Sequence, residues 1–122
     1  MCGSMLLLLV EDEPLVALAL QDTLESAGFK VLTADNGLEG SAALDRIIHD
    51  ISGLITDIRL GSGPDGWRLA RCARAKRVDL PIVYVTGDSA HAFDAEAVPN
   101  SVLLQKPFAP SKMISALKAV LA

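Results

Sequence analysis

Acidic side chains follow two separate apolar runs of the chain. Glu11, Asp12 and Glu13 come directly after the first run, and Asp57 ends a later one. If Glu11, Asp12 and Asp57 meet, their mutual repulsion raises the pKa of at least one carboxyl group unless a cation lies between them. Oxygen ligands in an open site that water or phosphate oxygens complete suit Mg²⁺ better than a caged Ca²⁺ ion. The pattern therefore predicts a magnesium site at these carboxylates.

A hydroxyl group and an ammonium group stand at the ends of two further apolar runs. Thr86 ends the run that begins at Ile82, and Lys106 comes directly before Pro107. Lys106 would bring a compact positive charge to the carboxylates, and Thr86 would bring a hydroxyl donor. An aspartate can act as the nucleophile in phosphoryl transfer when a cation offsets the negative charge. The residues together predict a pocket for a phosphoryl group on Asp57, held by Mg²⁺, Lys106 and Thr86.

Alternating strands and helices must position these side chains. The apolar and β-branched runs predict strands at residues 6–10, 30–33, 53–56, 82–86 and 102–105. Helical spacing predicts helices at residues 14–28, 38–48, 67–77 and 111–121, with a weak helix in the Ala-rich stretch before the fifth strand. This alternation predicts a doubly wound α/β fold, in which five parallel strands are covered by helices on both faces. In such sheets the functional groups gather at the carboxyl ends of the strands, where the residues above stand.

Length and composition limit both the fold and the function. The 122 residues suffice for one domain, and 51% hydrophobic against 21% charged residues exclude a disordered chain. We assign residues 5–122 to this domain and residues 1–4 to a short added or disordered segment. The net charge of −4 disfavours direct binding to nucleic acid. The first apolar run is too short to cross a membrane, so we expect a cytoplasmic protein in which Cys2 and Cys72 are free thiols.

The chain resembles the response-regulator receiver domain of two-component signalling from Met5 onward. Five short motifs carry this resemblance in the family's order: Val10-Glu11-Asp12, Thr56-Asp57, Asp65-Gly66, Val85-Thr86-Gly87 and Lys106-Pro107-Phe108. The resemblance implies a flavodoxin-like, three-layer sandwich whose parallel strands lie in the order 2-1-3-4-5. It also implies a cis peptide bond between Lys106 and Pro107, which the tertiary amide before proline makes accessible.

The same resemblance implies a function and a set of site residues. Asp57 would accept a phosphoryl group from the phosphohistidine of a histidine kinase or a histidine phosphotransfer protein. Mg²⁺ would be held by Asp12, Asp57 and the backbone carbonyl of Arg59, while Glu11 would act mostly through water. Such a domain is not an enzyme beyond assisting its own phosphorylation and dephosphorylation, and it signals by a conformational change and by docking to a downstream protein. The kinase, the downstream target and the presence of a homodimer are left open.

Two segments depart from the usual receiver pattern. The loop of residues 59–66 lacks the proline that many receivers carry four residues after the phosphoacceptor, and it is one residue longer than usual. Leu103 stands where many receivers carry an aromatic residue that swings inward when the strand-four hydroxyl engages the phosphoryl group. The usual switch between hydroxyl and aromatic ring is therefore excluded in that form. The Thr-Gly motif and the missing aromatic are similar to a receiver subgroup with a reduced fourth helix.

Arg59 and Asp88 suggest a further feature at the mouth of the pocket. They stand two residues after Asp57 and two residues after Thr86. In receivers these positions flank the route of the attacking water. We expect a salt bridge between Arg59 and Asp88 to slow hydrolysis of the phosphoaspartate.

Three other classes of protein share parts of this pattern. A haloacid-dehalogenase-type phosphatase needs a second aspartate, as a general acid, at the position of Arg59. A flavodoxin-like binding module would place a phosphate beside Glu11, Asp12 and Glu13, which would repel it. An inactive pseudo-receiver that acts only through protein contacts would usually lack an acidic or a lysine position, and it remains the main alternative. A stand-alone regulator, a phosphate shuttle and a piece of a larger protein are equally compatible with the receiver interpretation.

Two surfaces of the domain carry further hypotheses. The basic residues between positions 67 and 77 form either a solvated helix face or a partner-docking surface. The face made by the fourth helix, the fifth strand and the fifth helix adjoins Thr86 and Lys106. We expect signalling output to run through that second face.

Overall fold

The computed structural model describes residues 5–121, so the segment 1–4, with Cys2, and residue 122 lie outside the described residues. The strands are β1 (Leu6–Val10), β2 (Lys30–Ala34), β3 (Gly53–Asp57), β4 (Ile82–Thr86) and β5 (Ser101–Gln105). The helices are α1 (Pro14–Ser26), α2 (Gly37–Ile47), α3 (Gly66–Lys76), α4 (Phe93–Glu96) and α5 (Pro110–Leu121). The predicted weak helix is confirmed as a 3₁₀ turn at Ala90–Ala92 followed by the four residues of α4.

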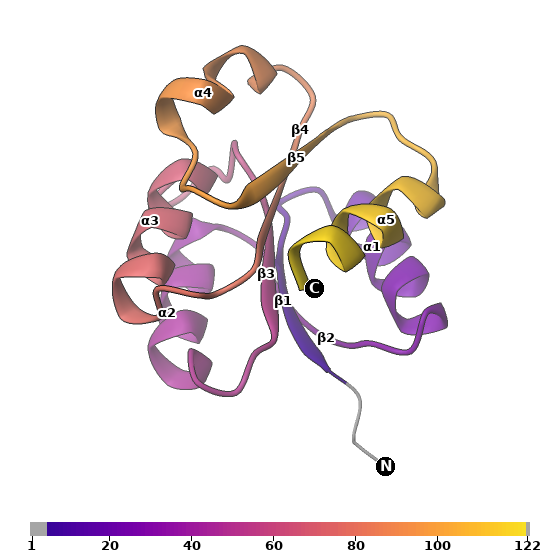
Figure 1. The fold of residues 1–122 in the computed structure, drawn as a ribbon, viewed down its shortest axis with the longest axis horizontal. Helices are drawn as coiled ribbons and strands as arrows, with labels where there is room; N and C mark the ends of the chain where they lie inside the picture. Colours follow the sequence, from indigo (N-terminus) through magenta and orange to yellow (C-terminus); the bar gives the residue numbers. More distant parts are fainter. Residues whose placement is uncertain (1–4, 122) are drawn as a thin grey trace.

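The five strands form one parallel sheet in the order β2-β1-β3-β4-β5, which confirms the predicted topology. Helices α1 and α5 cover one face of the sheet, and α2 and α3 cover the other, with α4 beyond α3 near the end of β4 (Figure 1). Because all strands run in the same direction, their carboxyl ends reach the same edge of the sheet. That edge brings together the residues that follow β1, β3, β4 and β5.

The central strands are almost completely buried. Every residue of β3 and β4 is buried, and so are the last four residues of β1. A parallel strand covered on both faces needs apolar side chains at successive positions, which explains the continuous apolar runs in the sequence. The edge strands β2 and β5 are only partly covered. The site residues at the ends of β1 and β3 are therefore carried by strands that are buried on both faces.

Helix α1 packs through one stripe of residues spaced four apart. Val16, Leu20 and Leu24 lie against the core, and the last two are buried. Leu15 and Leu18 share the helical pattern in the sequence, but they lie outside this stripe and keep 82% and 63% of their surface exposed. The predicted helix is confirmed, whereas these two leucines form an apolar surface instead of core. None of the helices within residues 5–121 is long and apolar enough to cross a membrane.

The basic residues of α3 fasten the loops around that helix. The Arg74 guanidinium donates hydrogen bonds to the carbonyl oxygens of Leu80, Pro99 and Asn100 at 2.7, 2.6 and 3.1 Å. Arg77 donates in the same way to two carbonyls of the segment between α2 and β3. Neither a freely solvated face nor a docking surface describes these two arginines, because their donors are used inside the domain.

The loop between β3 and α3 turns back onto the start of α2. Gly61 and Gly63 adopt φ values of 71° and 82°, in the region that glycine occupies without strain. The amide of Leu38 donates a hydrogen bond to the carbonyl oxygen of Ser62 at 3.1 Å. The path of this long loop, which the sequence left undefined, is thus fixed by α2.

Candidate functional site

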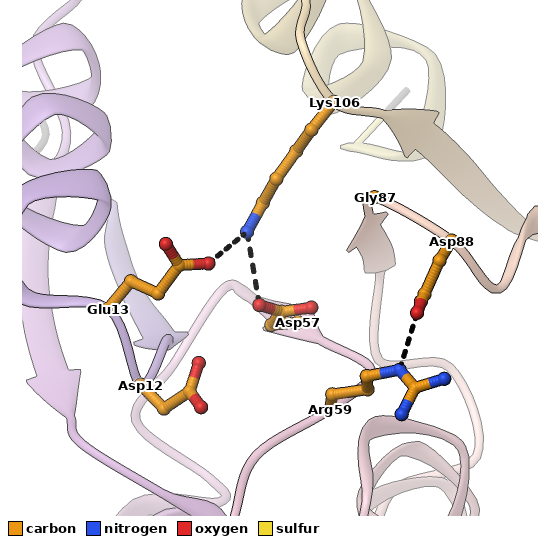
Figure 2. Close-up of a pocket in the computed structure, with 7 residues that line it drawn as sticks. All are labelled: Asp12, Glu13, Asp57, Arg59, Gly87, Asp88 and Lys106. Carbon is orange, nitrogen blue, oxygen red and sulfur yellow. Dashed lines mark hydrogen bonds and ion pairs between the residues drawn. The ribbon is translucent and has the colours of Figure 1, made fainter.

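Lys106 and several carboxylates meet at the carboxyl edge of the sheet (Figure 2). The Nζ atom of Lys106 lies 3.1 Å from Oδ2 of Asp57 and 3.1 Å from Oε1 of Glu11. It also lies 3.6 Å from Oε1 of Glu13, whose side chain is exposed. Asp57 ends β3, the two glutamates follow β1 and Lys106 follows β5. The structure therefore brings the predicted residues Glu11, Asp57 and Lys106 into contact.

The carboxylate of Asp57 is held in one orientation. Its Oδ1 accepts a hydrogen bond from the amide of Ile58 at 2.7 Å, while its Oδ2 accepts one from Lys106. Only 7% of the residue is exposed. Gly66 lies directly behind it, since a Cβ atom at that position would be 2.1 Å from the carbonyl oxygen of Asp57. The backbone of α3 is therefore packed against the predicted phosphoacceptor.

Four acidic residues offer ligands for a cation, namely Glu11, Asp12, Glu13 and Asp57, each with one carboxylate oxygen within 4.8 Å of the others. Among the described residues, Oε1 of Glu11 is buried and has no partner other than the ammonium group of Lys106, which lies 3.1 Å away and is shared with Asp57 and Glu13. A buried carboxylate oxygen in this condition is stabilised by a cation. Because all the possible ligand atoms are oxygens and Asp12 is open to solvent, the four residues fit Mg²⁺.

The carboxylates outnumber the single ammonium group. Burial and then the neighbouring Asp57 carboxylate raise the pKa of Glu11 to about 7, against the lowering effect of Lys106. Burial alone would lower the pKa of Lys106, but hydrogen bonds and charge from Asp57 and Glu11 outweigh it and raise that pKa. Lys106 thus stays charged, while the negative charge around it is only partly neutralised. This imbalance favours a bound cation.

Thr86 ends β4, but its hydroxyl oxygen contacts its own turn. Oγ1 accepts hydrogen bonds from the amides of Asp88 at 3.2 Å and Ser89 at 2.9 Å. Both bonds use the oxygen as the acceptor, so the hydroxyl hydrogen is free of them. The role of Thr86 as a donor to a phosphoryl group stays a prediction.

The predicted salt bridge between Arg59 and Asp88 is present. Nε of Arg59 lies 2.7 Å from Oδ2 of Asp88, and the two side chains are 77% and 54% exposed. Pairing with Arg59 and a hydrogen bond from Ser89 lower the pKa of Asp88. Figure 2 shows the pair on the side of Asp57 opposite Asp12 and Glu13. The role predicted for the backbone carbonyl of Arg59 in holding the metal stays a prediction.

A polar cavity of about 350 Å³ lies between these groups, lined by Asp12, Glu13, Asp57, Arg59, Gly87, Asp88 and Lys106. Its charged walls suit a small anion together with a cation. The peptide bond between Lys106 and Pro107 is cis, as the resemblance implies.

Sequence reasoning missed two features of this region. Glu13 received no role, although it stands in the acidic triplet, because its contact with Lys106 depends on the path of the turn into α1. An apolar groove of about 430 Å³ beside the site also went unnoticed. The groove is lined by Leu15, Val16, Ala19, Leu20, Thr23, Lys106, Pro107, Phe108 and Pro110. The spacing of Leu15 along α1 was the available signal, but spacing does not separate a core stripe from an exposed one.

A parallel sheet in the order β2-β1-β3-β4-β5, with acidic residues and a lysine at its carboxyl edge, defines the receiver class of α/β domains. A family model described as the response regulator receiver domain matches residues 7–118. The chain therefore belongs to the response regulator receiver domain family.

Several known proteins are similar to this chain. The response regulator receiver protein CpdR of Brucella abortus is 34% identical over 94% of this chain and 95% of that protein. A response regulator receiver protein of Sinorhizobium medicae has a crystal structure with a TM-score of 0.92 at 36% identity, covering 97% of this chain and 94% of that one. The response regulator TrrA of Thermotoga maritima, solved in complex with Mg²⁺–BeF, gives a TM-score of 0.80 at 26% identity, covering 95% and 98%.

Other matches are parts of larger proteins. They include a sensor kinase and the receiver domain of a hybrid histidine kinase. The chain spans 24% of the length of two curated transcriptional regulators that it matches at 30% and 33% identity.

Proposed function

We propose that this receiver domain accepts a phosphoryl group on Asp57 from the phosphohistidine of a histidine kinase or a histidine phosphotransfer protein. The observation that carries the proposal is the position of Asp57, whose carboxylate contacts Lys106 and lies among three further carboxylates. A carboxylate attacks an anionic phosphoryl group only when positive charge offsets the repulsion. Lys106 supplies such charge from one side, and a cation held by the acidic cluster would supply it from the other.

Each residue of the pocket has its own role in the proposed phosphoryl transfer. An oxygen of Asp57 attacks phosphorus, the P–N bond of the donor histidine breaks, and its electron pair stays on the imidazole nitrogen. Ile58 holds the other oxygen of Asp57 through its amide. Lys106 offsets the charge on the phosphoryl oxygens, and Thr86 donates its hydroxyl hydrogen to one of them. The product is an aspartyl phosphate, which water later hydrolyses.

The proposed cation is Mg²⁺. Asp12, Asp57 and the backbone carbonyl of Arg59 would hold it, with Glu11 acting through water. The single ammonium group of Lys106, which the carboxylates of Glu11, Glu13 and Asp57 share, supports a further cation at this position. When bound, the ion supplies positive charge beside the phosphoryl oxygens.

The phosphohistidine protein is proposed to dock in the apolar groove between α1 and the segment after β5. Leu15, one of the lining residues, is among the most exposed apolar side chains of the described chain. Exposed apolar surface of this kind marks protein contact sites. Lys106 lines both this groove and the polar cavity that contains Asp57. A protein seated in the groove would therefore bring its phosphohistidine to Asp57.

The proposal also assigns a mode of action. The chain is not an enzyme beyond assisting its own phosphorylation and dephosphorylation, and it works in the cytoplasm. It passes the signal to a downstream protein through the face of α4, β5 and α5. The net charge of −4 supports output through protein contact over direct contact with nucleic acid.

Phosphorylation is tested by incubating the full chain with Mg²⁺ and acetyl phosphate and measuring its intact mass. The wild type gains one phosphoryl group, Asp57→Asn gains none, and the control Asp50→Asn, at an exposed aspartate, behaves like the wild type. A wild type that stays unmodified under several conditions contradicts the proposal and favours the pseudo-receiver. A gain of mass in Asp57→Asn contradicts the choice of phosphoacceptor.

A further inference from the structure

Three of the five aromatic side chains in the sequence gather in one place. The ring centroids of Trp67 and Tyr84 lie 4.7 Å apart, and those of Tyr84 and Phe93 lie 6.3 Å apart in an edge-to-face arrangement. Trp67 belongs to the first turn of α3, Tyr84 to the middle of β4 and Phe93 to the start of α4. Trp67 and Tyr84 are buried. The three residues, which we call the aromatic cluster, thus connect three elements on one face of the sheet.

One end of the aromatic cluster is joined to the backbone of the phosphoacceptor. Gly66 precedes Trp67, and its amide donates a hydrogen bond to the carbonyl oxygen of Ile58 at 2.8 Å. The same glycine is packed so closely on Asp57 that a Cβ atom would lie 2.1 Å from the Asp57 carbonyl oxygen. Close packing of this kind transmits displacements. A shift of the backbone at residues 57 and 58 therefore moves Trp67.

The other end of the aromatic cluster holds α4, an element with little stability of its own. A helix of four residues is too short to persist without tertiary contacts. Phe93 rests on the ring of Tyr84, and the amide of Val98 donates a hydrogen bond to the Tyr84 hydroxyl at 3.1 Å. On the outer side, Arg71 donates to the carbonyl and to the carboxylate of Glu96, both at 3.1 Å. Tyr84 is therefore the inner support of both ends of α4.

Thr86 adds a second connection between the pocket and α4. It lies two residues after Tyr84 on the same strand, so both side chains project from the same face of the sheet. Its Oγ1 accepts hydrogen bonds from the amides of Asp88 and Ser89. These two residues form the turn that leads into the 3₁₀ segment. A rotation that turns the hydroxyl toward a phosphoryl group on Asp57 removes Oγ1 from these amides. The entry to α4 is then released, and the contact of Phe93 with Tyr84 decides where the helix settles.

Tyr84 lies beside the strand position at which many receivers carry their switching aromatic residue. Tyr84 pairs with Leu103 in the register of β4 and β5, and Leu103 is the aliphatic residue that excludes the usual aromatic switch. We propose that the aromatic cluster couples the phosphorylation state of Asp57 to the position of α4. This inference rests on the proposed function. The aromatic group involved stays buried on β4 instead of swinging on β5.

The test uses Trp67, the single tryptophan of the chain, together with hydrogen exchange of the amides at residues 87–98. The full chain is measured with and without Mg²⁺ and beryllofluoride, a mimic of the phosphoryl group. In the wild type we expect the emission of Trp67 to change and the exchange rates to change by at least about fivefold. Tyr84→Phe keeps the ring but loses the hydrogen bond with the amide of Val98. In this variant and in Phe93→Leu, we expect the change in exchange rates to fall to less than about half of the wild-type change.

Phe29→Leu is the matched control, because Phe29 is also partly buried but packs in the core layer on the other face of the sheet. This variant keeps the full exchange response. An unchanged response in Phe93→Leu, or an equal loss in Phe29→Leu, overturns the inference. Intact mass after acetyl phosphate treatment distinguishes a failure of the proposed function from a failure of this inference. A wild type that gains no phosphoryl group overturns both. Variants that gain the group and keep the full exchange response overturn the inference alone.

Discussion

The site has a buried side, formed by Glu11, Asp57 and Lys106, and an exposed side, formed by Arg59 and Asp88. Glu11 and Asp57 are 2% and 7% exposed and follow strands of the sheet centre. Arg59 and Asp88, on the other side, are exposed loop residues, and the loop of Asp88 leads into the four-residue helix α4. Groups held by a packed core keep the distances that chemistry needs, whereas loosely held segments rearrange at small cost. The difference indicates that the proposed phosphoryl transfer and the proposed response of α4 use different parts of the domain.

The sharpest way to test the buried side is to remove its positive charge. Lys106→Ala is expected to slow phosphorylation by acetyl phosphate about 10²-fold or more, because the charge that offsets the phosphoryl oxygens is lost. A time course of intact mass measures the rate. Lys112→Ala, which removes an exposed lysine of α5, keeps the wild-type rate. If Lys106→Ala reacts as fast as the control, the buried side is not the site of the transfer.

Magnesium binding tests whether the carboxylates act as one group. A Mg²⁺ concentration of 100 times the dissociation constant raises the free energy of unfolding by about 2.7 kcal/mol, which thermal or urea unfolding detects. Asp12→Ala removes an exposed ligand without disturbing the core, and it loses this stabilisation. Sodium chloride at matched ionic strength gives the baseline. Equal stabilisation of Asp12→Ala by Mg²⁺ would show that the ion binds elsewhere.

The loops before β4 and β5 are held in place by Arg74, which lies outside the cavity. Arg74→Ala removes three hydrogen bonds to backbone carbonyls before β4 and before β5, so we expect a loss of about 2 kcal/mol in the free energy of unfolding. Urea denaturation provides the measurement. Arg68→Ala, at an exposed position of the same helix, changes the value by less than about 0.5 kcal/mol. A similar loss in both variants would show that the three hydrogen bonds of Arg74 do not explain the effect, since alanine favours the helix at both positions.

The smallest expected effect concerns the salt bridge between Arg59 and Asp88. During hydrolysis, water attacks phosphorus, the P–O bond to Asp57 breaks with its electron pair returning to the carboxylate, and both water protons leave on the inorganic phosphate. If the bridge hinders this approach, Arg59→Ala and Asp88→Ala each shorten the phosphoaspartate lifetime about threefold, and the double variant shortens it no further. The melting temperature stays unchanged, because exposed bridges contribute little.

Lys76→Ala breaks a second exposed bridge, to Asp45 at 2.9 Å, and serves as its control. It leaves the phosphoaspartate lifetime unchanged. Lifetimes that are equal in all four variants and the wild type would show that the exposed side has no part in hydrolysis.

The sequence was sufficient for the fold because local and global patterns agree. Continuous apolar runs indicate strands buried on both faces, and their alternation with helices leaves few topologies. The contact of Asp57 with Lys106 was predictable for the same reason, since parallel strands must end at one edge. Leu15 shows the limit: an exposed stripe and a buried stripe of α1 have the same spacing, and only the packing separates them.

Contacts that depend on loop paths could not be predicted in this way. Of the three carbonyls that Arg74 binds, one belongs to the loop directly after α3 and two belong to the loop before β5, about 25 residues further along the chain. Composition alone makes such a residue look like a solvated charge. The hydroxyl of Thr86 was placed correctly at its strand end, but its bonds to Asp88 and Ser89 depend on how the next turn closes. The site residues were thus predicted by strand position, whereas their present partners were not.

Gly66 carries no charge, but its close packing against Asp57 makes the geometry of the site depend on it. A methyl group added at this position would collide with the backbone carbonyl oxygen of Asp57, the proposed phosphoacceptor, and would force α3 away from β3, although every acidic residue and the lysine would remain in the sequence. A genetic screen for inactive alleles would therefore recover changes at codon 66 alongside those that alter the charged residues. Anyone designing a permanently unresponsive version could begin there and keep the electrostatics intact.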